Sequence, residues 1–217
     1  MTFWDILIIL ARGAGYTILV TVASVSAGLA MGLFLAVLST IRWKAVSFFL
    51  AAYNYVFRSV PALVLLFLVF FGLPGLGIRI SPFVSIVLSL GLISGAYLAE
   101  IFRGAMAAVD QDEIVAAEAS GMNSMQIFLY IMFPQMFRMS IPGMINEFTS
   151  VLKYTPFAYT VGIPEIMKEA MSLAVMTLRG LEIYLAVGII YFIIYRLFVM
   201  LFMTFEKKFR IPGLAPE

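Results

Sequence analysis

The sequence predicts an all-α membrane protein with about five transmembrane helices. Of the 217 residues, 63% are hydrophobic and only 12% are charged, whereas an ordinary soluble domain has about 25% charged residues. The mean hydropathy is +1.06. A soluble domain of this length must expose a large share of its residues to water. The composition therefore excludes a water-soluble globular protein and indicates a lipid bilayer as the solvent.

Two residue types that carry much of enzyme chemistry are absent from the chain, which has no Cys and no His. Their absence excludes disulfide bonds, thiolate chemistry and His-ligated metals. It also removes the usual general base at neutral pH. The formal net charge is only +2, so we expect no nucleic-acid partner on charge grounds.

Five runs of the chain are long and apolar enough to cross a bilayer, which takes about 20 residues per helix. The first is rich in small residues that let helices approach closely. The second is interrupted by Arg58 and Pro61, and the fourth contains Glu147 and Lys153. No room is left for a soluble domain, so residues 1–217 are predicted to form one transmembrane domain. The predicted spans are residues 13–41, 46–73, 81–104, 139–163 and 183–205.

One further apolar stretch, residues 119–137, is not predicted to span the membrane. It is uncharged but contains several Ser, Asn and Gln side chains. Its pattern favours an amphipathic helix at the membrane surface. The apolar residues at helical spacing that would form its buried face are Ile127, Phe128, Ile131 and Met132.

The basic residues in short loops predict how the chain is oriented in the membrane. If the spans alternate, the denser group of basic residues falls on one side, which we assign to the cytoplasm. The protein is then a multi-pass protein of the inner membrane, with its N-terminus outside and its C-terminus in the cytoplasm. The basic residues on the cytoplasmic side are Arg42, Lys44, Arg103, Arg138, Lys207, Lys208 and Arg210.

The loop between the third and fourth spans, residues 109–134, contains a cluster of acidic residues in a chain with few charges. Its alanines favour a helix, and Gly121 permits a turn at the helix end. A second short helix is predicted over residues 123–133, with Pro134 ending it. A helix–Gly–helix unit on the cytoplasmic face can transmit force from a docked partner. The alternative is a solvated loop that only connects two spans.

This loop resembles the EAA loop of ABC importer permeases, in which Glu-Ala-Ala is followed at fixed spacings by Gly, Ile and Leu-Pro. Two positions depart from the pattern: Val115 stands in place of the Glu, and Phe133 in place of the Leu. Glu118 or Glu113 is the candidate replacement for the missing carboxylate. The residues that match are Ala116, Ala117, Gly121, Ile131 and Pro134.

The resemblance extends over nearly the whole chain, and it is specific to the permeases of polar amino-acid importers. Several segments match that family in the right order, which is more specific than any one of them. The matching segments are residues 57–61, 72–74, 96–104, 134–135, 152–155 and 181–184, together with Pro142 and Asn146.

The resemblance implies an ABC type I importer permease fold and a permease subunit that moves a polar amino acid into the cytoplasm by alternating access. It implies a second permease, identical or homologous, two copies of a cytoplasmic ABC ATPase, and an extracytoplasmic amino-acid-binding protein. The chain has no Gly-x-x-x-x-Gly-Lys-Ser/Thr phosphate loop. We therefore expect that the chain is not an enzyme and binds no cofactor. ATP and Mg²⁺ are expected to be used by the partner ATPase.

The resemblance also implies that the loop docks on the ATPase as a coupling helix. Gly121 is central to this hypothesis because it joins the two short helices. The residues expected to make or shape the contact are Glu113, Ala116, Ala117, Glu118, Gly121 and Met122.

Charged groups inside the fourth span are the candidate substrate ligands, since ionisable residues within a membrane tend to face a bundle interior or cavity. Glu147, Ser150 and Val151 share one helix face. We expect Glu147 to receive the ammonium or a basic side chain of the substrate, and Lys153 or the Thr155 hydroxyl to receive its carboxylate. Alternatively, Glu147 and Lys153 neutralise charges on other spans. Their spacing along the chain puts them on roughly opposite faces of one helix, so we expect no direct pair between them.

Arg58 and Pro61 are the candidate gate or hinge. Proline in a helix interior bends the helix, and Arg58 is expected near the cytoplasmic end of the second span. The alternative is an arginine that extends to the membrane surface beside a packing kink. Glu100 and Arg103 lie one turn apart, so a local ion pair is expected there.

Three other functions fit parts of the sequence. A secondary, ion-coupled transporter would usually show internal repeats, and no convincing repeat is present. An intramembrane enzyme would need a pair such as Ser150 and Lys153. An ABC permease of the methionine type has a similar length and span number, but residues 96–104 and 152–155 favour the polar amino-acid branch.

Overall fold

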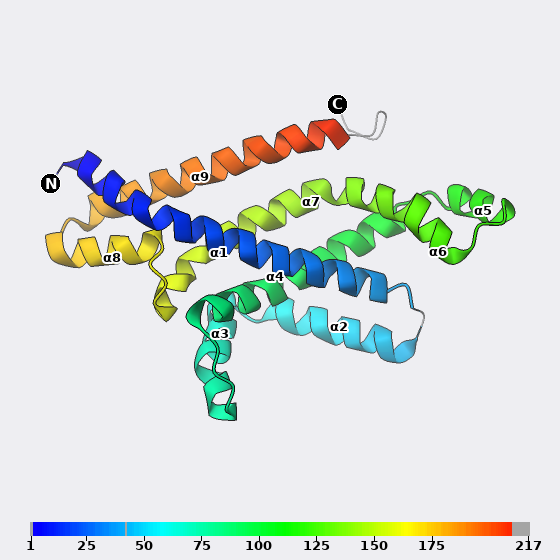
Figure 1. Cartoon of the computed structure of the whole chain (residues 1–217), viewed down its shortest axis with the longest axis horizontal. Coiled ribbons are helices and arrows are strands. Elements are labelled where there is room, and N and C mark those ends of the chain that lie inside the picture. The colour runs from blue at the N-terminus through cyan, green and yellow to red at the C-terminus, as the bar shows by residue number, and fades with distance from the viewer. Residues whose placement is uncertain (1, 42, 210–217) are drawn as a thin grey trace.

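A computed structural model describes residues 2–41 and 43–209 of the chain, with side chains as far as Thr204. Every regular element in these residues is a helix (Figure 1). Among the basic residues that predict the orientation, Arg42 and Arg210 lie outside the described residues, as do the side chains of Lys207 and Lys208. The α-helices are α1 (Phe3–Leu38), α2 (Lys44–Ser59), α3 (Ala62–Phe67), α4 (Pro82–Ala107), α5 (Gln111–Ala119), α6 (Ser124–Ile127), α7 (Phe133–Tyr154), α8 (Ile166–Thr177) and α9 (Gly180–Phe209).

The long helices form a bundle in which direction alternates. α1, α4 and α9 run one way, and α2 and α7 run the opposite way (Figure 1). The α1–α2 turn, the α5–α6 loop and the end of α9 therefore lie at one end of the bundle. The N-terminus and the α8–α9 turn lie at the other. This arrangement brings the segments that carry the denser basic residues to a single end.

α1 and α4 pack most closely, through small residues on both helices. A Cβ atom added at Gly28 would lie 2.7 Å from the Cβ of Ser94, and one added at Gly32 would lie 2.6 Å from the Cβ of Leu98. Ordinary carbon contacts are about 3.5–4.0 Å, so only glycine fits at these positions. The small residues of the first predicted span thus serve close helix packing, as in other membrane bundles.

α1 begins ten residues before the apolar run that predicts the first span. Its start is fixed by a capping box in which Thr2 and Asp5 satisfy each other's backbone N–H groups. Its end of the bundle is filled by a cluster in which Ile6 and Leu10 of α1 contact Ile166 of α8 and Ile183 of α9. This cluster ties the N-terminal part of α1 to the outer helices.

The second predicted span is sharply bent. α2 and the helical segment Ala62–Leu76 meet at an angle of 103° at Pro61, so the predicted kink is nearly a right-angle turn. α3 continues through a π-helical turn (Leu68–Gly72) and a 3-10 turn (Leu73–Leu76). In Figure 1 this segment points away from the long helices.

Within the described residues, three helices are each long and apolar enough to cross a membrane, namely α1, α4 and the Gly180–Thr204 part of α9, and the bent α2–α3 pair is a possible fourth. α7 has 22 residues but includes Arg138, Glu147 and Lys153. It lies inside the bundle against α4 and α1. Its lower apolarity is expected of a helix that faces protein.

The helix that follows Gly121 does not end at Pro134, contrary to the prediction from sequence. α6 passes directly into a π-helical turn (Phe128–Met132) and then into α7, where Pro134 lies in the first turn. A π turn changes the backbone hydrogen-bonding register, so the missing N–H of a proline is tolerated. Residues 124–154 therefore form one helical path. Of the predicted buried face, Ile127 is buried, while Phe128 and Met132 are half-buried against Phe102 and Met106 of α4.

Candidate functional site

The α5–α6 loop is a rigid unit whose turn depends on Gly121. Gly121 has a φ of +83°, a conformation that favours glycine. Its N–H donates to the Glu118 carbonyl at 2.9 Å, and the Met122 N–H donates to the Ala117 carbonyl at 3.1 Å. These are the two hydrogen bonds of a Schellman motif. The helix–Gly–helix unit predicted from the sequence is confirmed.

Both helices of this loop are capped at their N-termini. The Asp110 carboxylate accepts from the Asp112 N–H at 2.9 Å. Asn123 and Gln126 form a capping box with two bonds of 2.9 Å. The caps and the turn therefore satisfy the backbone groups at these helix ends within the loop itself.

The predicted coupling residues do not all face outward. Glu113, Ala116, Glu118 and Gly121 are exposed, Met122 is half-buried, and Ala117 is buried. Glu113 is not free, because its carboxylate accepts a hydrogen bond from the Gln135 side chain at the start of α7. Val115, at the position of the missing family Glu, is 60% exposed. The exposed surface of α5 is therefore partly apolar where the family pattern is acidic.

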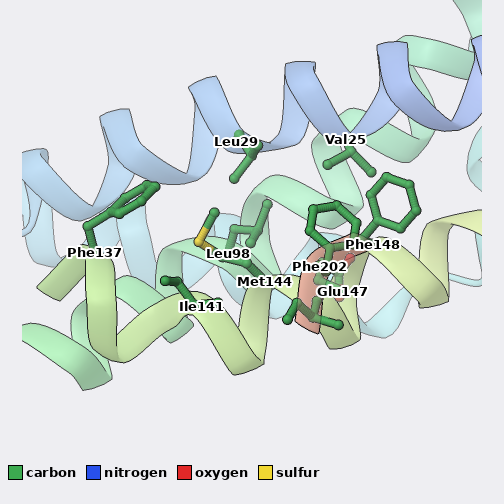
Figure 2. A pocket seen from close by; sticks show the side chains of 10 residues that line it. Val25, Leu29, Leu98, Phe137, Ile141, Met144, Glu147, Phe148 and Phe202 are labelled. Atoms are coloured by element: carbon green, nitrogen blue, oxygen red, sulfur yellow. The ribbon is translucent and has the colours of Figure 1, made fainter. Parts of the chain in front are cut away.

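Glu147 lies buried on α7, where it lines a cavity of about 310 Å³. Its carboxyl group lies beside the Ser94 hydroxyl of α4 without a well-formed hydrogen bond. The rest of the lining is apolar (Figure 2) and comes mainly from α7, with two residues from α1 and one each from α4 and α9. Glu147 forms no ion pair with another described side chain. The other lining residues are Val25, Leu29, Leu98, Phe137, Ile141, Met144, Ile145, Phe148 and Phe202.

The remaining predicted substrate residues are distributed over different surroundings. Ser150 donates to the Asn146 carbonyl at 3.0 Å, and Val151 is packed in the core. Lys153 is exposed, with its Nζ 5.9 Å from the centre of the Tyr195 ring on α9. Thr155 is fully buried and donates to the Leu152 carbonyl at 2.7 Å. The structure therefore does not bring these five residues together around one cavity.

Glu147 and Lys153 are separated, as their spacing on one helix predicts. Lys153 lines a second cavity, of about 330 Å³, between α7 and α9, whereas Glu147 lines the first. The ion pair expected between Glu100 and Arg103 is confirmed, with 2.5 Å between Arg103 Nη2 and Glu100 Oε2. Asn54 of α2 also donates to Glu100, at 2.7 Å.

Arg58 lies in the last turn of α2, at the bend before Pro61. This is the far end of α2 from Lys44, one of the basic residues that mark the cytoplasmic side. If Lys44 lies on the cytoplasmic side, Arg58 lies at the opposite end of α2, and the prediction that it is near the cytoplasmic end is wrong. The chain bends at Pro61, in the middle of the bundle. The guanidinium carbon lies 5.0 Å from the centre of the Tyr97 ring on α4. Arg58 and Pro61 both line a cavity of about 170 Å³ at the bend.

Sequence reasoning missed Glu165, a fully buried carboxylate between the fourth predicted span and α8. It accepts hydrogen bonds from the N–H groups of Met167 (2.8 Å) and Lys168 (2.9 Å), and from the Tyr191 hydroxyl (3.1 Å). Burial raises the pKa of Glu165 to about 7, although these hydrogen bonds favour its charged form. An acidic residue just before an apolar helix indicates an N-cap, and this signal is present in the sequence. The burial of Glu165 could not be predicted, because it depends on packing against α1 and α9.

Comparison with known proteins settles the family. Residues 28–211 match the binding-protein-dependent transport system inner membrane components. The chain belongs to this family. As an inner membrane component of a transport system, it is a permease subunit rather than an enzyme, and the family and fold class expected from the sequence are confirmed.

Individual relatives of this permease support the same assignment. The probable amino-acid permease YxeN of Bacillus subtilis (strain 168) is 33% identical over 199 residues, which cover 90% of this chain and 89% of the relative. The histidine/lysine/arginine/ornithine transport system permease HisQ of Escherichia coli (strain K12) is 34% identical over 198 residues, which cover 85% and 86%.

Solved structures agree with the permease fold. A crystal structure described as an amino acid ABC transporter with histidines matches with a TM-score of 0.87 and 30% identity, over 96% of this chain and 99% of that one. An inward-facing structure of the MetNI methionine ABC transporter matches with a TM-score of 0.77 over 94% and 97%, but at 18% identity. The second match supports the fold alone.

Proposed function

We propose that this permease moves a polar amino acid into the cytoplasm by alternating access, driven by ATP hydrolysis in a separate subunit. The observation that carries the proposal is the match, at a TM-score of 0.87 over 96% of the chain, to an amino acid ABC transporter. Relatives named for cystine, arginine and histidine transport support it. These substrates share an α-ammonium and an α-carboxylate, so the transport path needs groups for both charges.

The ATPase docks on the α5–α6 loop in this proposal. The loop lies at one extreme end of the bundle (Figure 1), its caps fix its shape, and most of its side chains are exposed. Two copies of the ATPase, which use ATP and Mg²⁺, serve this permease and a second one that is identical or homologous. The loop end is then cytoplasmic, which agrees with Lys44 and Arg103 at the same end.

The opposite end of the bundle faces the extracytoplasmic amino-acid-binding protein. It contains the N-terminus and α8, and the proposed topology puts the N-terminus outside and the C-terminus in the cytoplasm.

Large exposed side chains such as Phe34 on α1 and Phe192 and Leu197 on α9 face either lipid or the second permease. Apolar surface of this extent is stable only when lipid or protein covers it.

Glu147 is the proposed group for the ammonium of the substrate. Its carboxyl group is buried, lines a cavity and has no cationic partner among the described residues. A buried carboxylate without a partner is costly, and a bound ammonium offsets that cost. The cavity walls are otherwise apolar, and the attraction between opposite charges is stronger beside such walls than in open water.

Purification and reconstitution test the proposal. The tagged chain, purified from its own membranes, is expected to bring with it an ATPase that has a phosphate loop. Proteoliposomes of that complex, supplied with the binding protein, are expected to take up a radiolabelled amino acid only when ATP is inside. Uptake that proceeds without ATP and collapses with an ion gradient would instead establish a secondary transporter.

A further inference from the structure

A cavity of about 540 Å³ lies at the end of the bundle that contains the α1–α2 turn. It is formed where the end of α1, one face of α2 and the C-terminal part of α4 come together (Figure 1). It shares no lining residue with the Glu147 cavity or with the cavity at the α2–α3 bend. Its lining combines charged and hydroxyl side chains with an apolar wall, so an amphiphilic ligand matches it.

The end of the cavity nearest the α1–α2 turn carries a positive charge. Lys44, the first residue of α2, lies in the lining, and none of the side chains that the structure describes forms an ion pair with it. α2 begins without a side-chain cap, so the positive end of its helix dipole adds to the charge of Lys44. The Ser47 hydroxyl lines the cavity one turn further along. Together these groups suit an anion with several acceptor oxygens.

The acidic residue in the lining does not cancel this charge. Among the described residues that line the cavity, Glu100 is the only acidic one. Its carboxylate accepts a hydrogen bond from Arg103 at 2.5 Å and another from Asn54 at 2.7 Å. Arg103 therefore neutralises Glu100, and Lys44 remains as an excess positive charge. An anionic ligand is attracted to such a lining.

Two exposed aromatic side chains place the charged end of the cavity at the level of lipid headgroups. Trp43, which also lines the cavity, is 72% exposed, and tryptophan is enriched where hydrocarbon meets water. Phe48, about one turn beyond Lys44 on α2, is 77% exposed, as expected of a ring that faces hydrocarbon. Lys44 lies between these two residues in the sequence, which puts its charge at the depth of a phospholipid phosphate.

Deeper in the cavity the wall is apolar. Leu50 and Ala51 of α2 face Leu35 and Ala36 of α1 across it. α2 has no buried residue along its length, so its inner face is not closely packed on α1 and α4. A hydrocarbon chain that fills this space removes apolar surface from contact with water. Inorganic phosphate gains nothing from an apolar wall, and the wall therefore favours a lipid as the source of the anion.

We propose that this cavity binds an anionic phospholipid from the adjacent leaflet, with its phosphate at Lys44 and Ser47 and part of an acyl chain against Leu50 and Ala51. In the proposed topology this leaflet is the cytoplasmic one, but the inference depends only on the cavity lying at a membrane surface. The bound lipid fills the space between α2 and the rest of the bundle. It therefore stabilises the position of α2, because close packing replaces an open gap.

Native mass spectrometry of the full-length protein, with any partners that co-purify, measures lipid binding directly. The protein is delipidated in detergent and titrated with dioleoylphosphatidylglycerol, dioleoylphosphatidylcholine or inorganic phosphate. Wild type is expected to bind one phosphatidylglycerol per copy of the chain, at least fivefold more tightly than phosphatidylcholine, since one lysine near an anionic lipid contributes about this factor. Millimolar phosphate is expected not to displace the lipid.

Two variants that remove one charge each test the role of Lys44. Lys44→Gln is expected to lower the affinity for phosphatidylglycerol at least fivefold, with little change for phosphatidylcholine. Arg138→Gln removes an exposed charge of α7 that does not line the cavity, and it is expected to keep the wild-type affinity. The comparison separates binding in the cavity from general attraction between a basic surface and an anionic lipid.

A second pair of variants changes volume without changing charge. Ala51→Leu adds bulk inside the cavity, whereas Ala52→Leu adds the same bulk at an exposed neighbour that does not line it. Ala51→Leu is expected to lower the affinity for phosphatidylglycerol at least fivefold, because the lipid chain and the new side chain compete for one space. Ala52→Leu is expected to have no effect. This pair keeps the test decisive if Lys44→Gln fails to assemble.

Four results would overturn the inference. Wild type binds phosphatidylglycerol no more tightly than phosphatidylcholine, or millimolar phosphate displaces the lipid, which would indicate a site for a soluble anion. Alternatively, Arg138→Gln loses as much affinity as Lys44→Gln, or Ala51→Leu binds as tightly as Ala52→Leu. None of these measurements involves uptake, so the proposed transport function is tested separately.

Discussion

Substituting Gly13 by alanine is expected to destabilise the protein, because the new methyl group meets backbone that cannot move aside. A Cβ at this position lies 2.6 Å from Ile166 N, 2.7 Å from Glu165 C and 2.8 Å from Ile166 Cα. These distances are about 1 Å short of ordinary contact. The start of α8 must therefore move away from α1. This movement also weakens the hydrogen bond that the Ile166 N–H donates to the Thr17 hydroxyl, which is 3.4 Å long in the wild-type structure.

Gly15 provides a matched control on the same helix, since an added Cβ there has nothing within 4 Å. Both variants gain the higher helix propensity of alanine, about 0.5–1 kcal/mol, so the difference between them isolates the clash. Overpacking costs about 1–3 kcal/mol. For a chain of this size that corresponds to a melting temperature about 2–12 °C lower for Gly13→Ala than for Gly15→Ala.

The assay is thermal unfolding of each purified variant in the same detergent, followed by the loss of monodisperse protein on size-exclusion chromatography. Equal melting temperatures for the two variants would refute the close approach of α1 and α8. A decrease confined to Gly13→Ala supports it. Gly13→Ser, which adds a similar Cβ and a hydroxyl, is expected to fall at least as far as Gly13→Ala.

Three further predictions concern the loop, the buried Glu165 and the Glu147 cavity. Gly121→Val forces a β-branched residue to a φ of +83°, at a cost of about 1–3 kcal/mol. ATPase activity of the complex should persist while amino-acid uptake falls at least tenfold, and unchanged coupling in proteoliposomes would contradict this. Glu165 has a pKa of about 7 in the fold against an ordinary value of 4.5, so stability is highest below pH 4.5 and falls until pH 7, by about 3 kcal/mol. Thermal unfolding measured from pH 4.5 to 8 should show this decrease in stability. Glu165→Gln should remove the decrease, although the titratable neighbours Tyr191 and Glu169 are still present in that variant. Glu147→Gln should reduce uptake at least tenfold with the complex intact, and normal uptake with poor assembly would assign Glu147 a structural role.

The sequence predicts those parts of the fold that depend on local signals. Apolar length locates the long helices, and Gly121 marks the loop turn because its position requires a positive φ. Pro61 marks the bend, but not its angle of 103°, which is set by the packing of α2 and α3 on α4. The passage of the helix through Pro134 was not predictable, since it depends on the π turn before it.

The candidate site is less predictable because burial and partners come from other helices. Glu147 is identified by being charged within a span, but its cavity needs α1 and α9. The different surroundings of Lys153 and Thr155 depend on where α7 ends, at the Thr155–Val161 turn that contains Pro156. Arg58 is visible as a charge beside a proline, yet its stacking on Tyr97 and its cavity need α4 and α7.

The unbroken helical path from Ser124 to Tyr154 has a consequence for how motion is transmitted. By helix rise, Glu147 lies about 35 Å from the α5–α6 loop, and no non-helical segment separates the two. The path contains a π turn (Phe128–Met132) and an internal proline, Pro142, and helices bend at both kinds of position. A displacement of the loop therefore reaches the Glu147 cavity through a single helical connection whose only built-in bending points are these two places among the described residues.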